Sequence, residues 1–142
     1  MKRVLFYILS FTWGGIMSWI GVIVLLILLP FKNTQLKTYH GRVYMVVGKN
    51  WGGLELGCFF LCGENMGEHT LAHECGHGLQ NCLWGPLMPF VISIPSAVRY
   101  WYRRILEKKN YRKYRNLPPY DSIWFERQAT EWGTNYIMTD KF

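Results

Sequence analysis

The sequence predicts an α+β fold that follows an N-terminal transmembrane helix. Residues 4–29 contain no charged side chain, and residues 42–47 and 54–62 are short runs rich in β-branched and aromatic residues. The segments that follow are bounded by glycine and proline, which is typical of helices separated by turns. A chain of 142 residues suffices for about one compact domain. We therefore expect an anchor over residues 1–30, a linker and first strand over 31–50, and one domain over 51–142.

The first segment is long enough to cross a bilayer. A helix needs about 20 apolar residues to span roughly 30 Å of hydrocarbon, and residues 4–29 exceed that length before Pro30 ends the run. The stretch is longer than the apolar region of a signal peptide, and no A-x-A cleavage site follows it. We expect a single-pass membrane protein, with a buried helix of a soluble protein as the alternative.

The basic residues around this segment favour one orientation. Two of them precede it, whereas four follow it before the first acidic residue: Lys2 and Arg3, then Lys32, Lys37, Arg42 and Lys49. Lys and Arg are enriched on the cytoplasmic side of membrane helices. We therefore expect the domain on the cytoplasmic face.

Strands and turns are expected after the anchor. Residues 31–41 read as a short basic linker, residues 42–47 as a strand and residues 48–53 as a glycine-rich turn. Residues 54–62 form the second expected strand, interrupted by Gly57. Such a strand could be an ordinary core strand or the sheet edge that holds an extended substrate.

Two helices and an apolar segment are expected in the second half of the chain. The first helix covers residues 68–83 and ends at Gly85-Pro86. Residues 87–98 are apolar but interrupted by two prolines, so they could be a second span, a kinked core helix or a re-entrant segment. The last helix follows Pro118-Pro119, is capped by Asp121 or Ser122, and ends at Gly133.

A basic and aromatic run separates these helices. Residues 99–115 carry eight Lys or Arg against the single acid Glu107, within a chain of net charge +7. Such a run could bind nucleic acid or an anionic membrane, or could be a solvated helix face. The neighbouring rings of Tyr100, Trp101 and Tyr102 favour the membrane interface, so we expect lipid as the partner and no nucleic acid.

The stretch EHTLAHECGHGLQN, residues 68–81, contains the pattern H-E-x-x-H. Residues four apart project from nearly the same face of a helix, so His73 and His77 could offer two imidazole nitrogens to one metal ion. Glu74 is rotated by about 100° from His73, beside the ion, where it could take a proton from a metal-bound water. The pattern predicts Zn²⁺ as cofactor, with two histidine ligands and Glu74 as the general base. Histidines that are only capped or solvated are the alternative.

A catalytic zinc normally takes a third protein ligand and leaves one position open. Glu126 is the first candidate because it lies on a separate helix, where Ala129 is small enough to let two helices pack closely. Gly76 and Gly78 weaken their helix by about 1 kcal/mol each, which indicates the close approach of another backbone or of substrate. The reserve candidates are Glu131 and His69.

H-E-x-x-H followed by a separate helix with E-x-x-A resembles the gluzincin class of zinc peptidases, which includes membrane-anchored endopeptidases related to prenyl-protein proteases. Four segments also resemble motifs of a group of small bacterial proteins: GGLELG (52–57), HECGHGLQ (73–80), GPLMPFVISIPS (85–96) and FERQATEWG (125–133). The similarity covers about residues 51–133.

This resemblance implies a zincin-like metallopeptidase domain: a short β-sheet, an active-site helix and a ligand-bearing helix. It implies His73, His77 and Glu126 as metal ligands, Glu74 as the base, and a peptide or protein substrate. The chain departs from the pattern at Thr130, where gluzincins often have an aspartate that orients a ligating histidine. It also departs at Asn81 and Glu55, where the related motifs have serine.

Two other interpretations use the same residues. Cys58, Cys62, His73 and His77 come near the spacing of a Cys2His2 structural zinc module with a basic nucleic-acid- or lipid-binding stretch. Its loop is shorter than usual, and the cysteines are more simply free thiols. The third interpretation is a non-catalytic membrane protein that keeps a gluzincin-like shell.

Overall fold

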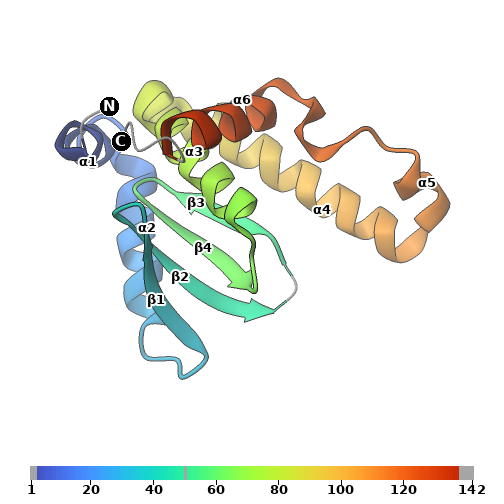
Figure 1. The fold of residues 1–142 in the computed structure, drawn as a ribbon, viewed down its shortest axis with the longest axis horizontal. Helices are drawn as coiled ribbons and strands as arrows, with labels where there is room; N and C mark the ends of the chain where they lie inside the picture. Colours follow the sequence, from blue (N-terminus) through green and yellow to red (C-terminus); the bar gives the residue numbers. More distant parts are fainter. Residues whose placement is uncertain (1–2, 50, 138–142) are drawn as a thin grey trace.

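The computed structural model describes residues 3–49 and 51–137, which form an α+β fold with helices on both faces of a mixed four-stranded sheet (Figure 1). This confirms the predicted α+β class. In chain order, the helices and strands are α1 (Arg3–Phe11), α2 (Gly15–Leu28), β1 (Thr34–Tyr39), β2 (Arg42–Lys49), β3 (Gly53–Leu56), β4 (Phe59–Glu64), α3 (Glu68–Trp84), η1 (Gly85–Leu87), η2 (Pro89–Ser93), α4 (Ile94–Lys109), α5 (Tyr111–Arg115), η3 (Tyr120–Ser122), α6 (Trp124–Trp132) and η4 (Gly133–Ile137).

The strands follow the order β1-β2-β4-β3, so β3 lies at one edge of the sheet. The neighbours β1 and β2 are antiparallel, β2 and β4 are parallel, and β4 and β3 are antiparallel. Two-residue turns close both hairpins. Gly41 in the first has φ 78° and Gly57 in the second has φ 72°, a backbone conformation that glycine adopts without strain.

Two expectations for this region are wrong. Residues 54–62 are not one strand, because Gly57 reverses the chain and divides the segment into β3 and β4. Residues 31–41 are not only a linker, because they contain β1. This strand is polar and largely exposed, and it pairs along one edge with β2. It therefore lacks the apolar alternation that reveals a half-buried strand in a sequence.

Each face of the sheet is covered by a helix. Tyr44, Phe60 and Cys62 pack with Cys75 of α3 on one face. Met45 and Leu61, whose side chains point the opposite way, belong to a cluster that includes Leu25 of α2. Side chains alternate between the faces of a strand, so β2 and β4 are apolar on both faces and form the centre of the sheet.

The single helix expected over residues 4–29 is divided into α1 and α2. One side chain and one backbone carbonyl near the end of α3 form hydrogen bonds with the break. Asn81 Nδ2 donates to Gly14 O at 3.2 Å, and Leu83 O accepts from Trp13 Nε1 at 3.3 Å. Over residues 3–49 and 51–137, no single helix has the length and apolar character to cross a membrane. Two bent helix pairs reach that length and apolar character only when both helices are taken together. They are α1 with α2, bent by 90°, and residues 68–87 with 89–109, bent by 117°.

Arg42 ties the amino-terminal helix to α3 instead of lying at the surface. Its side chain is buried, its Nη1 donates to Cys75 O at 2.7 Å, and its guanidinium carbon lies 3.8 Å from the ring centre of Phe6 in α1. A cation over an aromatic face is attracted by the ring electrons. Because Arg42 is buried, it is not one of the exposed basic residues after the first segment that favour a cytoplasmic orientation of the domain.

The predicted helix over residues 68–83 is confirmed as α3, and it ends at Gly85 as expected. The apolar segment that follows is a kinked helix, in which the π-helical turn η2 continues into α4. The bend of 117° between residues 68–87 and 89–109 turns the chain back. As Figure 1 shows, α4 runs away from the top of α3, and the chain then returns so that α6 lies beside α3.

Small residues allow α3 and α6 to pack backbone to backbone. A Cβ atom at Gly76 would overlap the carbonyl oxygen of Ala129, and one at Gly133 would overlap the carbonyl oxygen of Ala72. Ala129 itself is fully buried. The expectation drawn from Gly76 and Ala129 is therefore confirmed. The last helix begins at Trp124 without a side-chain cap, so the caps predicted at Asp121 and Ser122 are wrong; both residues lie in η3.

We predict that Gly76→Ala lowers the free energy of unfolding by about 1–3 kcal/mol, the usual result of forcing a methyl group into packed structure. The reason is that α6 must move away from α3. Urea unfolding of the purified chain measures the change. Gly67→Ala is the matched control, because a Cβ there meets no atom within 4 Å; it should change stability by about 1 kcal/mol or less. Equal effects at both positions would contradict the packing.

Candidate metal centre

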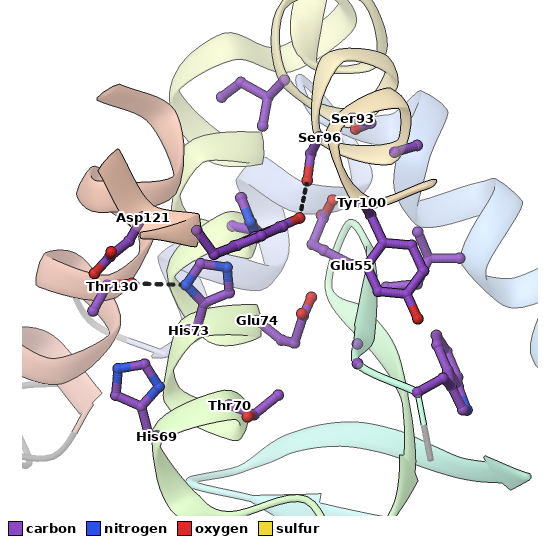
Figure 2. A pocket seen from close by; sticks show the side chains of 18 of the residues that line it. Glu55, His69, Thr70, His73, Glu74, Ser93, Ser96, Tyr100, Asp121 and Thr130 are labelled. Carbon is purple, nitrogen blue, oxygen red and sulfur yellow. Dashed lines mark hydrogen bonds between the residues drawn. The ribbon is translucent and has the colours of Figure 1, made fainter. Parts of the chain in front are cut away.

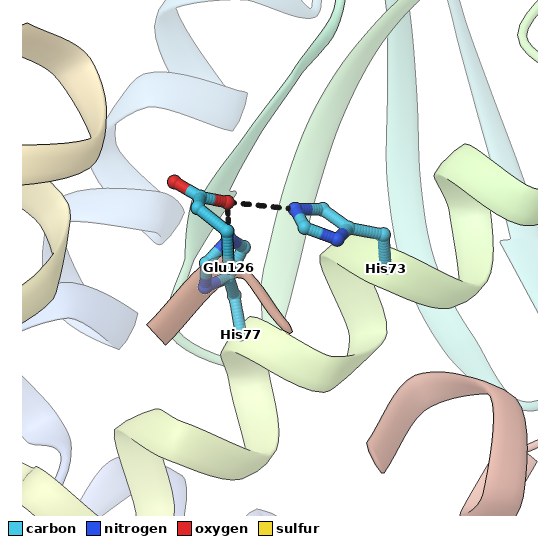
Figure 3. Close-up of side chains that lie close together, drawn as sticks. All are labelled: His73, His77 and Glu126. Carbon is cyan, nitrogen blue, oxygen red and sulfur yellow. Dashed lines mark hydrogen bonds and ion pairs between the residues drawn. The ribbon is translucent and has the colours of Figure 1, made fainter. Parts of the chain in front are cut away.

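Three side chains from two helices meet at one point (Figure 3). Glu126 Oε2 lies 3.1 Å from His73 Nε2 and 3.2 Å from His77 Nε2. One ligand atom from each residue lies within 4.8 Å of the other two, so the group could hold a metal ion. The structure thus brings together the ligands expected from the sequence, although 49 residues separate His77 from Glu126.

The helices explain this convergence. His73 and His77 are one turn apart on α3, and their ring centres are 4.6 Å apart. Glu126 lies in the first turn of α6 between the buried residues Phe125 and Ala129, which fix the rotation of that helix. Because α6 contacts α3 so closely at Gly76, even the short reach of a glutamate brings its carboxylate to both imidazoles.

Gln80 fixes which nitrogen of His77 faces the centre. Its Nε2 donates to Phe125 O at 2.8 Å and to Gln128 Oε1 at 3.0 Å. Its Oε1 must therefore be the acceptor at 2.7 Å from His77 Nδ1, which consequently carries a proton. This leaves the lone pair of neutral His77 on Nε2, the atom beside Glu126. No role was predicted for Gln80 from the sequence, although its i+3 spacing from His77 on a helix was the available signal.

Thr130 supports His73 in the same manner. Its hydroxyl lies 2.8 Å from His73 Nδ1 and can accept a hydrogen bond from the Nδ1–H group. In that tautomer the lone pair of the neutral ring is on Nε2, which faces Glu126. At this position the resemblance to gluzincins led us to expect a weaker neutral partner in place of aspartate. The structure places the threonine at hydrogen-bonding distance, which orients the ring without adding a charge.

These orientations direct three electron-rich atoms at one another. Glu126 is fully buried, and its Oε1 has no hydrogen-bond partner among the described residues. Burial by itself raises the pKa of Glu126, but when the two imidazoles carry a proton on Nε2, their hydrogen bonds to the carboxylate outweigh burial and hold the pKa well below its ordinary value. For His77, burial acts to lower the pKa, but Glu126 and Glu74 raise it to about 9. The cluster therefore requires positive charge, which either protons or one metal cation can supply.

Glu74 stands beside this group and is not part of it. It is buried, and burial raises its pKa. Figure 2 shows its carboxylate pointing from α3 into a cavity of about 520 Å³ that is also lined by His73 and His77. Gly53 of β3 makes room for it, because a Cβ there would overlap the Glu74 carboxylate. The position agrees with the expected division between two ligands and one base.

Other polar groups share the cavity. Glu55 of β3 lines it, and burial raises the pKa of this side chain to about 8. The sequence singled it out only as a departure from a serine. On the opposite wall, Tyr120 Oη lies 3.4 Å from Ser96 Oγ, and burial raises its pKa to about 12. A cavity that combines aromatic side chains with several convergent polar groups is typical of a small-molecule or peptide site.

The remaining sequence candidates lie elsewhere. His69 lines the cavity outside the metal group, and Glu131 is exposed. Cys58 packs with Phe6 and Leu79, whereas Cys62 packs in a separate cluster with Tyr44 and Phe60, and neither cysteine belongs to the group around His73 and His77. All four cysteines are free thiols, as expected.

We predict that Gln80→Leu weakens divalent-metal binding by about 10–100-fold, the usual effect of removing a hydrogen-bond partner from a ligating histidine. A zinc titration against a competing chelator measures it. Gln128→Ala is the control, because it removes only a neighbour of Gln80 and should change affinity far less. An unchanged affinity in Gln80→Leu would show that His77 does not need this partner.

Glu55 predicts a pH dependence of stability in the metal-free protein. Its pKa is raised from 4.5 to about 8, so between these values the folded chain binds more protons than the unfolded chain. Its contribution to stability is present below pH 4.5 and is lost as the pH rises to about 8. Glu55→Gln should therefore flatten the fall in unfolding free energy over this window, measured by urea unfolding. An identical pH slope in both proteins would contradict the raised pKa.

No protein-family model, curated protein or solved structure matched the chain. The function is therefore proposed from the site itself, in which Glu126 meets a histidine pair, and that pair and the buried carboxylate of Glu74 line one cavity.

Proposed function

We propose that the protein is a membrane-anchored, zinc-dependent hydrolase that cleaves peptide bonds. The observation that carries the proposal is the joint arrangement of His73, His77 and Glu126 with Glu74 on the wall of the same cavity. A structural metal site has four protein ligands and no open position, whereas a catalytic zinc site has three and is open to water. Three ligands beside an accessible cavity favour the catalytic kind.

The donor set favours zinc. Two imidazole nitrogens and one carboxylate oxygen are the ligands of many catalytic zinc sites, and the absence of sulfur from the group disfavours softer metals. Zinc bound there would supply a polarised water with a pKa lowered to about 7.

Glu74 is suited to take and return a proton. An ordinary glutamate is a weak base at neutral pH, but burial raises the pKa of Glu74 and makes its carboxylate more basic. The side chain points into the cavity (Figure 2), and His73 and His77 line the same cavity. It would accept a proton from the attacking water and donate it to the amine that leaves when the peptide bond breaks.

The edge strand β3 favours an extended peptide as substrate. Gly63 N donates to Gly52 O at 3.1 Å, and bonded positions alternate along an antiparallel pair. Residues 52, 54 and 56 therefore bond to β4, whereas the backbone groups of Gly53 and Glu55 point away from it. Both residues line the cavity. A peptide added as a further strand would pair with these groups and would pass directly beside Glu74.

Helices α1 and α2 are the proposed membrane anchor. They carry no charged side chain from Val4 onward, and many large apolar side chains of the two helices and of the break between them are exposed: Val4, Leu5, Ile8, Trp13, Ile16, Trp19, Ile20, Ile23, Leu26 and Ile27. Such a surface is characteristic of contact with lipid or protein. The basic residues after α2 favour the cytoplasmic side for the site.

We predict that Glu74→Gln retains stoichiometric zinc but lowers peptide hydrolysis by about 10²-fold or more, because only the proton acceptor is lost. Glu126→Ala should lose zinc and activity together. Metal analysis and cleavage of a peptide library by the full chain in detergent or vesicles measure both properties.

Cys58→Ser and Cys62→Ser are the controls for this experiment, since neither cysteine belongs to the metal group. Both should keep zinc. Loss of zinc in the cysteine variants, together with normal zinc content in Glu126→Ala, would contradict the proposed site and favour the structural zinc module.

A further inference from the structure

Helix α4 carries an unpartnered apolar stripe. Ile94, Val98, Trp101 and Ile105 are each more than half exposed. Their spacing of four, three and four residues places them on one face of the helix, over roughly 16 Å of its length. Phe90 in η2 is also exposed and extends the stripe towards α3. A monomeric soluble protein rarely leaves so continuous an apolar surface uncovered.

Positive charge is concentrated at the far end of this helix. Of the eight basic residues between 99 and 115, three are engaged within the chain: Arg99 and Arg103 donate to the backbone of residues 118–120, and Arg104 pairs with Glu107 at 2.9 Å. The other five are exposed in the last turn of α4 and in α5: Lys108, Lys109, Arg112, Lys113 and Arg115. Their clustering gives this end of the helix a surface that is complementary to an anionic partner.

The combination identifies that partner. An apolar helix face with tryptophan and tyrosine near it and several cations at its end is the composition of helices that lie in a bilayer interface. A second copy of this chain would satisfy the stripe but not the cations, because each copy has a net charge of +7. Anionic lipid satisfies both. The start of α4 also adjoins the proposed anchor, since Ser93 Oγ lies 4.0 Å from Met17 Sδ of α2.

We infer that α4 is an interfacial helix, with the stripe from Ile94 to Ile105 in the lipid and the cations of residues 108–115 on anionic headgroups. This surface is separate from the α1–α2 anchor and does not depend on metal or on hydrolysis. It has a consequence for the cavity. Ser96, Ala97 and Tyr100 line the cavity from the neighbouring face of the same helix, and Trp101 belongs to both surfaces. The cavity therefore lies within about one helix diameter, ~10 Å, of the lipid.

A nitroxide label at one residue of α4 tests the inference, because it reports the surroundings of that residue alone. Flotation with vesicles would not separate α4 from the proposed anchor, since either could bind the chain to lipid. The full chain carries the label at Val98→Cys or, as the matched control on the same helix, at Lys109→Cys. It is reconstituted in phosphatidylcholine vesicles with phosphatidylglycerol. The native cysteines should take up little label, because three of them are buried and Cys82 is partly buried. The unsubstituted chain, treated with the same reagent, measures this background labelling. We expect the ratio of oxygen to water-soluble nickel collisions to be several-fold higher at Val98 than at Lys109.

Two further results decide the matter. Reversing Arg112, Lys113 and Arg115 to Glu should lower the ratio at Val98 towards that at Lys109; no change would overturn the role of anionic headgroups. Equal ratios at Val98 and Lys109, or a label at Val98 shielded from both reagents by a second copy, would overturn the lipid contact. Zinc content and hydrolysis are measured separately, so failure of this inference leaves the proposed function standing, and the reverse holds too.

Discussion

The contact between the backbones of α3 and α6 is the constraint on which the site depends. A glutamate reaches only a few ångströms beyond its own backbone, so Glu126 can meet two imidazoles on another helix only if the helices nearly touch. Gly76, Ala129 and Gly133 permit that approach because they have small side chains or none. The bend after Gly85 sends the chain outward along α4, and the return of the chain after α5 brings α6 beside α3.

Packing of this kind also concentrates buried charge. Glu55, Glu74 and Glu126 are three of the nine acidic residues of the chain, and all three are buried near one cavity. Burying a carboxylate is unfavourable unless hydrogen bonds or cations compensate it. Each glutamate responds differently: Glu126 is held ionised between histidines, whereas burial raises the pKa of Glu55 and Glu74. A bound cation would stabilise the folded chain, because the unfolded chain lacks the assembled site.

The metal-binding residues could be predicted from the sequence, whereas several elements of the surrounding fold could not. The pairing of the i, i+4 histidines follows from the geometry of one helix, and Glu126 was nominated because a zinc site needs a third ligand and because E-x-x-A resembles the gluzincin pattern. Strand β1 was missed because its exposed polar residues show no alternation, and the β3–β4 hairpin because one glycine turn looks like an interrupted strand. Asn81 donates a hydrogen bond at the break between α1 and α2, but it is distant in sequence, so no local pattern in residues 4–29 predicts the break.

The most direct test of the central claim is the X-ray absorption spectrum of the zinc-loaded protein. Ligation by His73, His77 and Glu126 predicts two imidazole nitrogens and one carboxylate oxygen, with metal–ligand distances of about 2.0–2.2 Å and a further oxygen from water. Glu126→Ala should remove the protein oxygen or the bound metal altogether. A sulfur shell at about 2.3 Å, or a spectrum unchanged in Glu126→Ala, would contradict the account.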